Sequence, residues 1–175
     1  MLALRPVGQI VAELGARRRV PASVPGSARG ALAAALPAGF FSRLDDIGGQ
    51  EIAGDFMLLN LAQLLRETAG RDHPLIALGT AWWVFATSGT GDAWLLRRTE
   101  RGSQVAFLDH DRGTDALPAE MGIDFDQWLQ LADLMAQVEL TDHGGSEPAN
   151  VDEITREMNR LSEGLPQRYP YSLDG

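Results

Sequence analysis

Four short apolar runs between residues 74 and 109 constrain the fold more than any other feature of this sequence. They are rich in β-branched and aromatic residues and are separated by glycine or polar residues: PLIAL (74–78), AWWVFAT (81–87), DAWLLRR (92–98) and SQVAFLD (103–109). This spacing is typical of an antiparallel meander. The intervening TERG predicts a tight hairpin loop with a positive φ at Gly102, and SGTG (88–91) predicts a similar turn.

Segments with helical periodicity flank these runs on both sides. The pattern predicts helices over residues 6–18, 27–35, 38–47 and 124–140, a strand passing into a helix over 56–68, and a last helix beginning near Asn150. Asp124 with Gln127, and Asn150 with Glu153, have the spacing of capping boxes. Helices, then strands, then a helix predict an α+β fold, with an antiparallel sheet packed by helices and an extra C-terminal helix.

The composition excludes several kinds of chemistry. The 175 residues contain no cysteine, so disulfides, thiolate zinc sites and cysteine nucleophiles are absent. All 15 basic residues are arginine, which leaves no P-loop lysine and no Schiff-base lysine. Arg5 and Glu13 interrupt the first apolar stretch, and no run reaches the roughly 18 residues of a membrane span. We therefore expect an unprocessed, cytoplasmic protein without a membrane segment.

The net charge of −9 is distributed unevenly along the chain. Residues 1–43 carry +5, residues 44–108 carry −3 and residues 109–175 carry −11, and the only consecutive arginines of the first part are residues 17–19. An acidic carboxyl half repels nucleic acid and favours a basic protein partner. The same charge also fits a solvated surface that keeps the protein in solution.

The residues that could bind a phosphate or a metal ion fit structural roles better than these functional ones. SGTG precedes a predicted strand, whereas a phosphate-binding loop needs a helix after it. In an extended strand, Asp109 and Asp111 would share one face and His110 the other, which does not gather the three around a metal ion. Only His73 and His143 remain as further histidines, both in predicted loops. We therefore predict no metal and no cofactor.

Serine and acid–base catalysis are not favoured either. TDHGGSEP (141–148) has the glycines and serine of an oxyanion loop, but the sequence has no G-x-S-x-G elbow to accompany it. The adjacent acids Asp45 and Asp46 close a predicted helix before Gly48 and Gly49. No pair of carboxylates is placed in a way that requires acid–base work. The sequence therefore predicts a protein that is not an enzyme.

The tryptophans of the predicted strands leave two interpretations open. Trp82 and Trp83 are adjacent in a strand and must point to opposite faces of the sheet. If one face is exposed, a tryptophan beside acidic residues would suit a protein interface. If both faces are covered, one of them by helices, these side chains belong to the core.

The order of these segments resembles the SMI1/KNR4, or SUKH, superfamily. ALAAALPAGFFSRLDDIGG is similar to the family's two helices with a Leu-Pro between them and a closing glycine pair. PLIALGT, SGTGDAWLL and VAFLDHD resemble its successive strands, including the Gly-Asp before the central strand, and IDFDQWLQLADLM resembles its closing helix. The resemblance covers about residues 27–141, with residues 1–26 as an N-terminal extension and residues 142–175 as a linker, a C-terminal helix and a tail.

The resemblance implies a curved sheet and a function in protein binding. Many bacterial members of this family are immunity proteins that neutralise a cognate toxin, often a nuclease, whereas eukaryotic relatives are regulators and scaffolds. The expected partner is thus a toxin protein rather than nucleic acid or membrane, and a regulatory or scaffold module is the alternative. The tentative partner surface comprises Trp82, Trp94, Asp109 and Asp111. Gly48, Gly49, Gly91 and Asp92 are expected to be structural turn residues.

Overall fold

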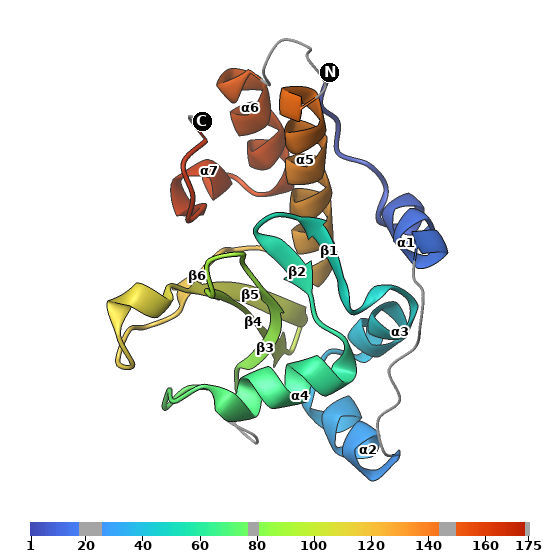
Figure 1. Cartoon of the computed structure of the whole chain (residues 1–175), viewed down its shortest axis with the longest axis vertical. Helices are drawn as coiled ribbons and strands as arrows, with labels where there is room; N and C mark the ends of the chain where they lie inside the picture. Colours follow the sequence, from blue (N-terminus) through green and yellow to red (C-terminus); the bar gives the residue numbers. More distant parts are fainter. Residues whose placement is uncertain (18–25, 77–80, 144–149, 174–175) are drawn as a thin grey trace.

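The computed structural model describes residues 1–17, 26–76, 81–143 and 150–173 (Figure 1). Within these residues the chain has an α+β fold, in which helices pack around one curved antiparallel sheet. The strands follow chain order across the sheet, from β1 at one edge to β6 at the other. Their bounds are β1 Gln50–Ala53, β2 Phe56–Leu58, β3 Trp83–Thr87, β4 Ala93–Thr99, β5 Gly102–Leu108 and β6 Ala119–Glu120.

The predicted helices at 6–18, 38–47, 124–140 and near Asn150 are confirmed within a few residues. The helices are α1 Val7–Arg17, α2 Gly26–Ala35, α3 Ala38–Ile47, α4 Leu61–Gly70, α5 Phe125–His143, α6 Val151–Leu161 and α7 Leu165–Arg168, with a 3-10 turn η1 at His110–Arg112. Asp124 and Gln127 form the expected reciprocal cap of α5. Asn150 caps α6 by accepting the backbone N–H of Asp152, at 2.8 Å, but the predicted capping box with Glu153 does not form, because the Glu153 carboxylate accepts the Leu2 N–H instead.

Three of the four predicted strands of the meander form the centre of the sheet. The runs at 81–87, 92–98 and 103–109 become β3, β4 and β5, which pair antiparallel. Thr99 pairs with Gly102 across the second hairpin, and Gly102 has the expected positive φ of 133°. The predicted strand at 74–78 differs, because a turn closes where the Ile76 N–H donates to the His73 carbonyl. Residues 77 and 78 lie outside the described residues.

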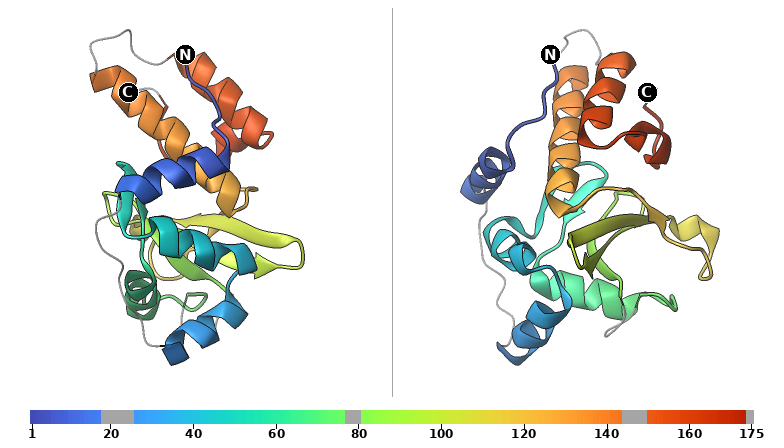
Figure 2. Two further views of the ribbon diagram at one scale, coloured as in Figure 1. Left: turned by 90° about the vertical axis from the view of Figure 1, so that its right-hand side faces the viewer. Right: turned by 180° about the vertical axis from the view of Figure 1, so that it is seen from behind.

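Both faces of the central strands are covered by helices (Figure 2). Helix α4 packs on β3 from one side, and the Val84 N–H donates to the buried Thr68 hydroxyl at 3.0 Å. Helix α5 packs on the other side, where six aromatic rings lie with their centroids 4.7–6.2 Å apart: Phe40, Phe56, Phe85, Trp94, Phe125 and Trp128. Aromatic side chains carry large apolar areas, so this cluster is a major contribution to the core.

The segments at both ends of the chain pack into the same core. Leu2, Ile10 and Leu14 are buried with it, and so are Ile154 and Met158 of α6. The sequence-based boundaries at 26/27 and 141/142 therefore do not separate independently packed units among the described residues. None of the helices in the described ranges combines the length and the apolar character that crossing a membrane requires.

Candidate functional site

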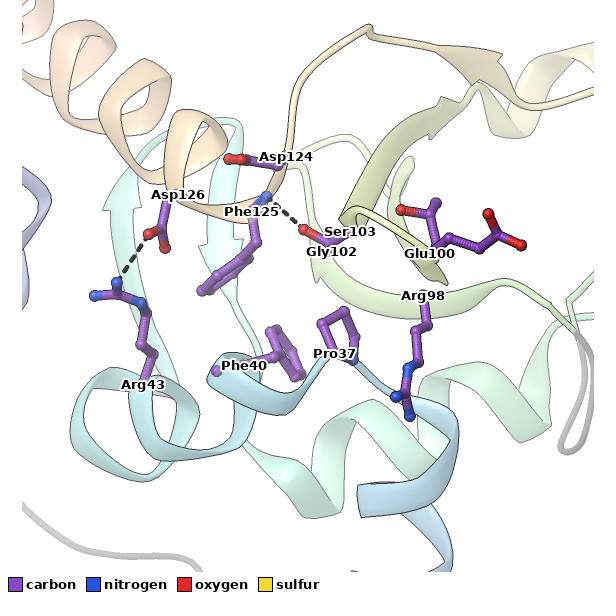
Figure 3. A pocket seen from close by; sticks show the side chains of 12 residues that line it. Pro37, Phe40, Arg43, Arg98, Glu100, Gly102, Ser103, Asp124, Phe125 and Asp126 are labelled. Atoms are coloured by element: carbon purple, nitrogen blue, oxygen red, sulfur yellow. Dashed lines mark hydrogen bonds and ion pairs between the residues drawn. The ribbon is translucent and has the colours of Figure 1, made fainter.

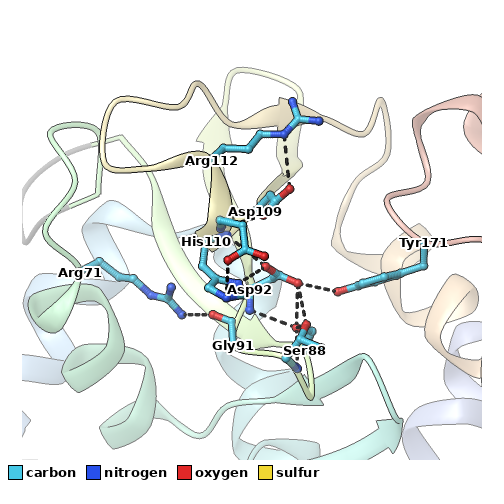
Figure 4. A network of polar contacts seen from close by, with 10 residues as sticks. Arg71, Ser88, Gly91, Asp92, Asp109, His110, Arg112 and Tyr171 are labelled. Atoms are coloured by element: carbon cyan, nitrogen blue, oxygen red, sulfur yellow. Dashed lines mark hydrogen bonds and ion pairs between the residues drawn. The ribbon is translucent and has the colours of Figure 1, made fainter.

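Asp92, just before β4, is the centre of a polar network (Figure 4). Its side chain is almost buried, and its Oδ1 accepts both the backbone N–H of His110, at 3.1 Å, and the ring Nδ1–H of His110, at 2.7 Å. Its Oδ2 accepts the hydroxyls of Ser88 at 3.2 Å, Thr90 at 2.8 Å and Tyr171 at 3.4 Å. One carboxylate thus joins the β3–β4 turn, η1 and the C-terminal tail.

The glycine-rich stretch SGTG builds the turn that holds Asp92 in place. The Ser88 N–H donates to the Asp92 carbonyl at 3.1 Å, the Asp92 N–H donates to the Ser88 hydroxyl at 3.1 Å, and Gly91 takes a positive φ of 98°. A strand follows this turn, not a helix, as the sequence predicted. The loop therefore lacks the helix N-terminus that a phosphate cradle needs.

The electrostatics of the pair favour an ionised Asp92 and a charged His110. Burial alone would raise the pKa of Asp92, but the hydrogen bonds from the His110 ring, the His110 backbone, Thr90 and Ser88 outweigh it and lower the pKa to about 2. The hydrogen bond to Asp92 raises the pKa of His110, and the nearby charges of Asp111 and Asp109 act in the same direction. The contact is therefore a charge-assisted hydrogen bond over much of the pH range below neutrality.

The triplet Asp109-His110-Asp111 differs from the extended arrangement expected from sequence. Strand β5 ends at Leu108, and the Asp109 side chain caps the 3-10 turn by accepting the Asp111 N–H at 2.9 Å. The turn rotates His110 toward Asp92, so that Asp92, Asp109 and His110 place potential metal-ligand atoms within 4.8 Å of one another. These atoms already have partners, because Asp92 and His110 bond to each other and Asp109 pairs with Arg112 at 3.3 Å. The absence of a metal stays a prediction.

The network orients an imidazole without forming a serine–histidine pair. The hydroxyls of Ser88 and Thr90 donate to Asp92 Oδ2, whereas the His110 ring contacts Asp92 Oδ1 through Nδ1. The other ring nitrogen, Nε2, lies 3.2 Å from Asp111 Oδ1. A nucleophile must contact the base that activates it, and among the described residues no hydrogen bond joins either hydroxyl to His110. What the network does is fix the chain that follows β5.

We call residues 109–118 the acidic loop, because it carries Asp109, Asp111 and Asp115 against a single arginine, Arg112. Besides the attachment through His110, the loop has a second one near its far end. His73, which is buried, donates from Nε2 to the Ala116 carbonyl at 2.7 Å, and its Nδ1 accepts the Leu75 N–H at 3.2 Å. The acidic loop is therefore held at both ends by imidazole groups.

The tentative partner surface needs correction at its two tryptophans. Trp94 is fully buried in the aromatic cluster and donates its indole N–H to the Asp55 carbonyl at 2.8 Å, so it cannot contact a partner in the folded chain. Trp82 is only 6% exposed, and the Arg97 guanidinium lies over its ring at 4.6 Å. The interpretation with both sheet faces covered is thus the correct one for these side chains. Asp109 and Asp111, in contrast, are accessible on the acidic loop.

The glycine pair at the end of α3 has a steric explanation. A Cβ on Gly48 would lie 2.6 Å from the Leu44 carbonyl oxygen, and Gly49 has a positive φ of 85°.

Ser88 and Tyr171 are members of the Asp92 network that the sequence analysis did not single out. The Ser-Gly-Thr-Gly-Asp order gave a local signal for Ser88, whereas Tyr171 is 79 residues away from Asp92 and gave none.

A hollow of about 400 Å³ lies between α3, the β4–β5 hairpin and the start of α5 (Figure 3). Pro37, Phe40 and Phe125 form its apolar floor. Its two arginines are engaged, because Arg43 pairs with Asp126 at 2.8 Å and Arg98 donates to the Ala34 carbonyl at 3.2 Å. Its charged side chains do not converge on a common point in Figure 3, so it defines no ligand chemistry of its own.

Comparison with protein-family models, with curated proteins and with solved structures found no match. The resemblance to the SUKH superfamily therefore remains a prediction from the sequence.

Proposed function

We propose that this chain is a non-catalytic protein-binding domain, an immunity protein that binds and neutralises a basic toxin in the cytoplasm. The observation that carries the proposal is the acidic loop, an exposed and negatively charged segment attached at both ends through His110 and His73. A segment that is ordered before binding loses less conformational entropy when a partner docks. Its charge favours a partner with a basic surface.

The distribution of charge supports a partner of the nuclease type. Residues 109–175 carry −11, and a surface of this sign is attracted to the basic site where a nuclease holds nucleic acid. Long-range attraction of this kind raises the rate of association and makes it dependent on salt. The arginines at residues 17–19 have the opposite sign, and residues 18 and 19 lie outside the described residues.

A capture experiment followed by a growth assay tests the proposal. The tagged chain is used to capture proteins from its native organism at low and at moderate salt, and each captured protein is then expressed alone in a sensitive host. We expect one stoichiometric partner whose complex with this chain persists at moderate salt, and which arrests growth when it is expressed alone. Co-expression of this chain is expected to restore growth.

The alternative function gives a different result in the same experiment. A regulatory or scaffold module would capture several exchangeable partners that do not arrest growth. If the chain fails to restore growth against every captured protein, the proposal is wrong, whatever the affinity of those proteins.

A further inference from the structure

Two exposed leucines share one hollow of the described surface. Four large apolar residues are prominently exposed in the described ranges: Met1, Leu75, Leu117 and Leu140. Two of them, Leu75 and Leu117, line the same hollow. A concentration of apolar side chains at the surface marks an interaction site more often than scattered single residues do.

Leu117 of the acidic loop lies between two hollows. One, of about 470 Å³, has an apolar lining from Pro74, Leu75, Ala81 and Pro118, with Trp82 and Arg97 beside them. The other, of about 270 Å³, lies against the C-terminal tail, and its lining combines Phe107, Tyr169 and Pro170 with the charged Asp109, Arg112 and Arg168, of which Arg168 donates to the Met121 carbonyl and the Ser162 hydroxyl. Leu117 lines both hollows and is itself 81% exposed. A partner covering Leu117 would therefore reach apolar surface on either side.

The charge around Leu117 indicates the chemistry of that partner. Asp109, Asp111 and Asp115 precede it in the loop, and Glu120 follows it in β6. Glu120 is neutralised by Arg97 at 2.9 Å, and Asp109 by Arg112 at 3.3 Å. Asp111 lies 3.2 Å from His110 Nε2, and Asp115 has no cationic partner among the contacts of the described residues. This surface complements an apolar side chain flanked by arginine or lysine.

We propose that Leu117 is the central contact of a docking surface for a basic protein partner, which inserts an apolar side chain flanked by basic residues beside it. The proposal rests on the proposed function for the identity of the natural partner, but the surface itself can be tested without that partner. The loop is already fixed by His110 and His73, so docking needs no large rearrangement.

The test is selection from a library of random short peptides against the full chain, followed by affinity measurements with two variants. Leu117→Ser removes the proposed contact. Leu140→Ser is the matched control, because Leu140 is 74% exposed on α5, outside both hollows. Neither substitution changes a buried side chain, so both variants are expected to fold, which circular dichroism checks.

We expect enriched peptides with an apolar residue next to arginine or lysine. They should bind the wild-type chain and Leu140→Ser equally, and Leu117→Ser at least about tenfold more weakly. No enrichment, or peptides that bind Leu117→Ser as tightly as wild type, would overturn the proposed surface. If the peptide result holds but no captured protein is toxic, the surface stands and the toxin-neutralising function fails.

Discussion

Two almost buried carboxylates hold distant parts of this chain together, and they do so with different partners. Asp133 on α5 is paired with Arg5, which also reaches Glu13, and so attaches the amino-terminal segment. Asp92 is paired with His110 and so attaches the acidic loop. An arginine stays charged at every pH a folded protein meets, whereas a histidine titrates near neutrality.

The two attachments differ in how strongly they depend on pH. The Arg5 pair is a fixed part of the core region, and its hydrogen bonds with Asp133 and Glu13 raise the pKa of Arg5 even further. The His110 pair lies at the surface, with 42% of the imidazole side chain exposed. The strength of the contact between His110 and Asp92 therefore depends on pH. This attachment of the acidic loop, which carries Leu117, varies with it.

The largest effect is expected from breaking the Arg5 attachment. Arg5→Ala leaves the buried Asp133 carboxylate with Gln137 as its remaining side-chain hydrogen-bond donor, at 2.9 Å. Leaving one member of a buried ion pair alone is strongly destabilising, so we expect a loss of about 3 kcal/mol in the free energy of unfolding. Urea denaturation measures it.

Glu13→Gln is the matched control for that variant. It removes the other, more exposed carboxylate from the same arginine, at 2.7 Å. Exposed ion pairs contribute about 0–1 kcal/mol, so the loss should be several times smaller than for Arg5→Ala. Equal losses from the two variants would show that Asp133 is not the carboxylate that matters.

Asp92→Asn is expected to have the next largest effect. The pKa of Asp92 is lowered from 3.8 to about 2, which corresponds to a contribution of about 2 kcal/mol at neutral pH. Because the folded-state pKa is below the unfolded one, this stability is present above about pH 4 and is lost as the pH falls toward 2. We expect urea denaturation between pH 7 and pH 2 to show this loss in the wild type and a smaller one in Asp92→Asn.

The pH dependence of the His110 attachment should be a smaller effect of opposite sign. The folded-state pKa of His110 is raised above 6.5, so its contribution is complete below pH 6.5 and declines as the pH rises through the folded-state value. We expect the protection of the acidic-loop amides, measured as the exchange rate relative to the intrinsic rate at the same pH, to fall over that rise, and His110→Gln to remove this fall. Protection of these amides that stays constant with pH in the wild type would contradict the role given to His110.

The smallest effect on stability is expected from the two exposed leucines. Leu117→Ser and Leu140→Ser should each change the free energy of unfolding by no more than about 0.5 kcal/mol, as surface substitutions usually do. Thermal denaturation of both variants checks this. A large loss in Leu117→Ser would mean that the side chain packs against the chain itself instead of serving a partner.

Local patterns predicted the parts of the fold that local interactions determine. The three central strands and most helices follow from alternation, helical spacing and caps, as at Asp124 and Gln127. Strand β1 was missed because Gln50 and Glu51 interrupt any apolar run, and β6 because it has only two residues. Both depend on neighbouring strands for their pairing.

The site was less predictable because it depends on contacts between distant residues. Trp94 was expected at a partner surface, but α5 covers its face of the sheet, and a strand pattern cannot show which faces are covered. An extended strand was expected to put His110 on the face opposite Asp109 and Asp111. This was wrong because Asp109 ends the strand by capping η1, which the sequence did not reveal. Asp92 was correctly expected near a turn, but its contact with Tyr171 spans 79 residues.

We expect the acidic loop to contribute more to the attraction of the partner than the rest of the negative charge does. The most direct test measures the association rate of the captured partner with two triple variants of equal charge change. One carries Asp109→Asn, Asp111→Asn and Asp115→Asn, which retain capping oxygens. The other carries Asp46→Asn, Glu51→Gln and Glu163→Gln at exposed sites outside the loop. We expect the loop variant to associate about tenfold more slowly at low salt and to lose most of the salt dependence, with a much smaller change in the other. Equal slowing in both variants, or in neither, would contradict the account.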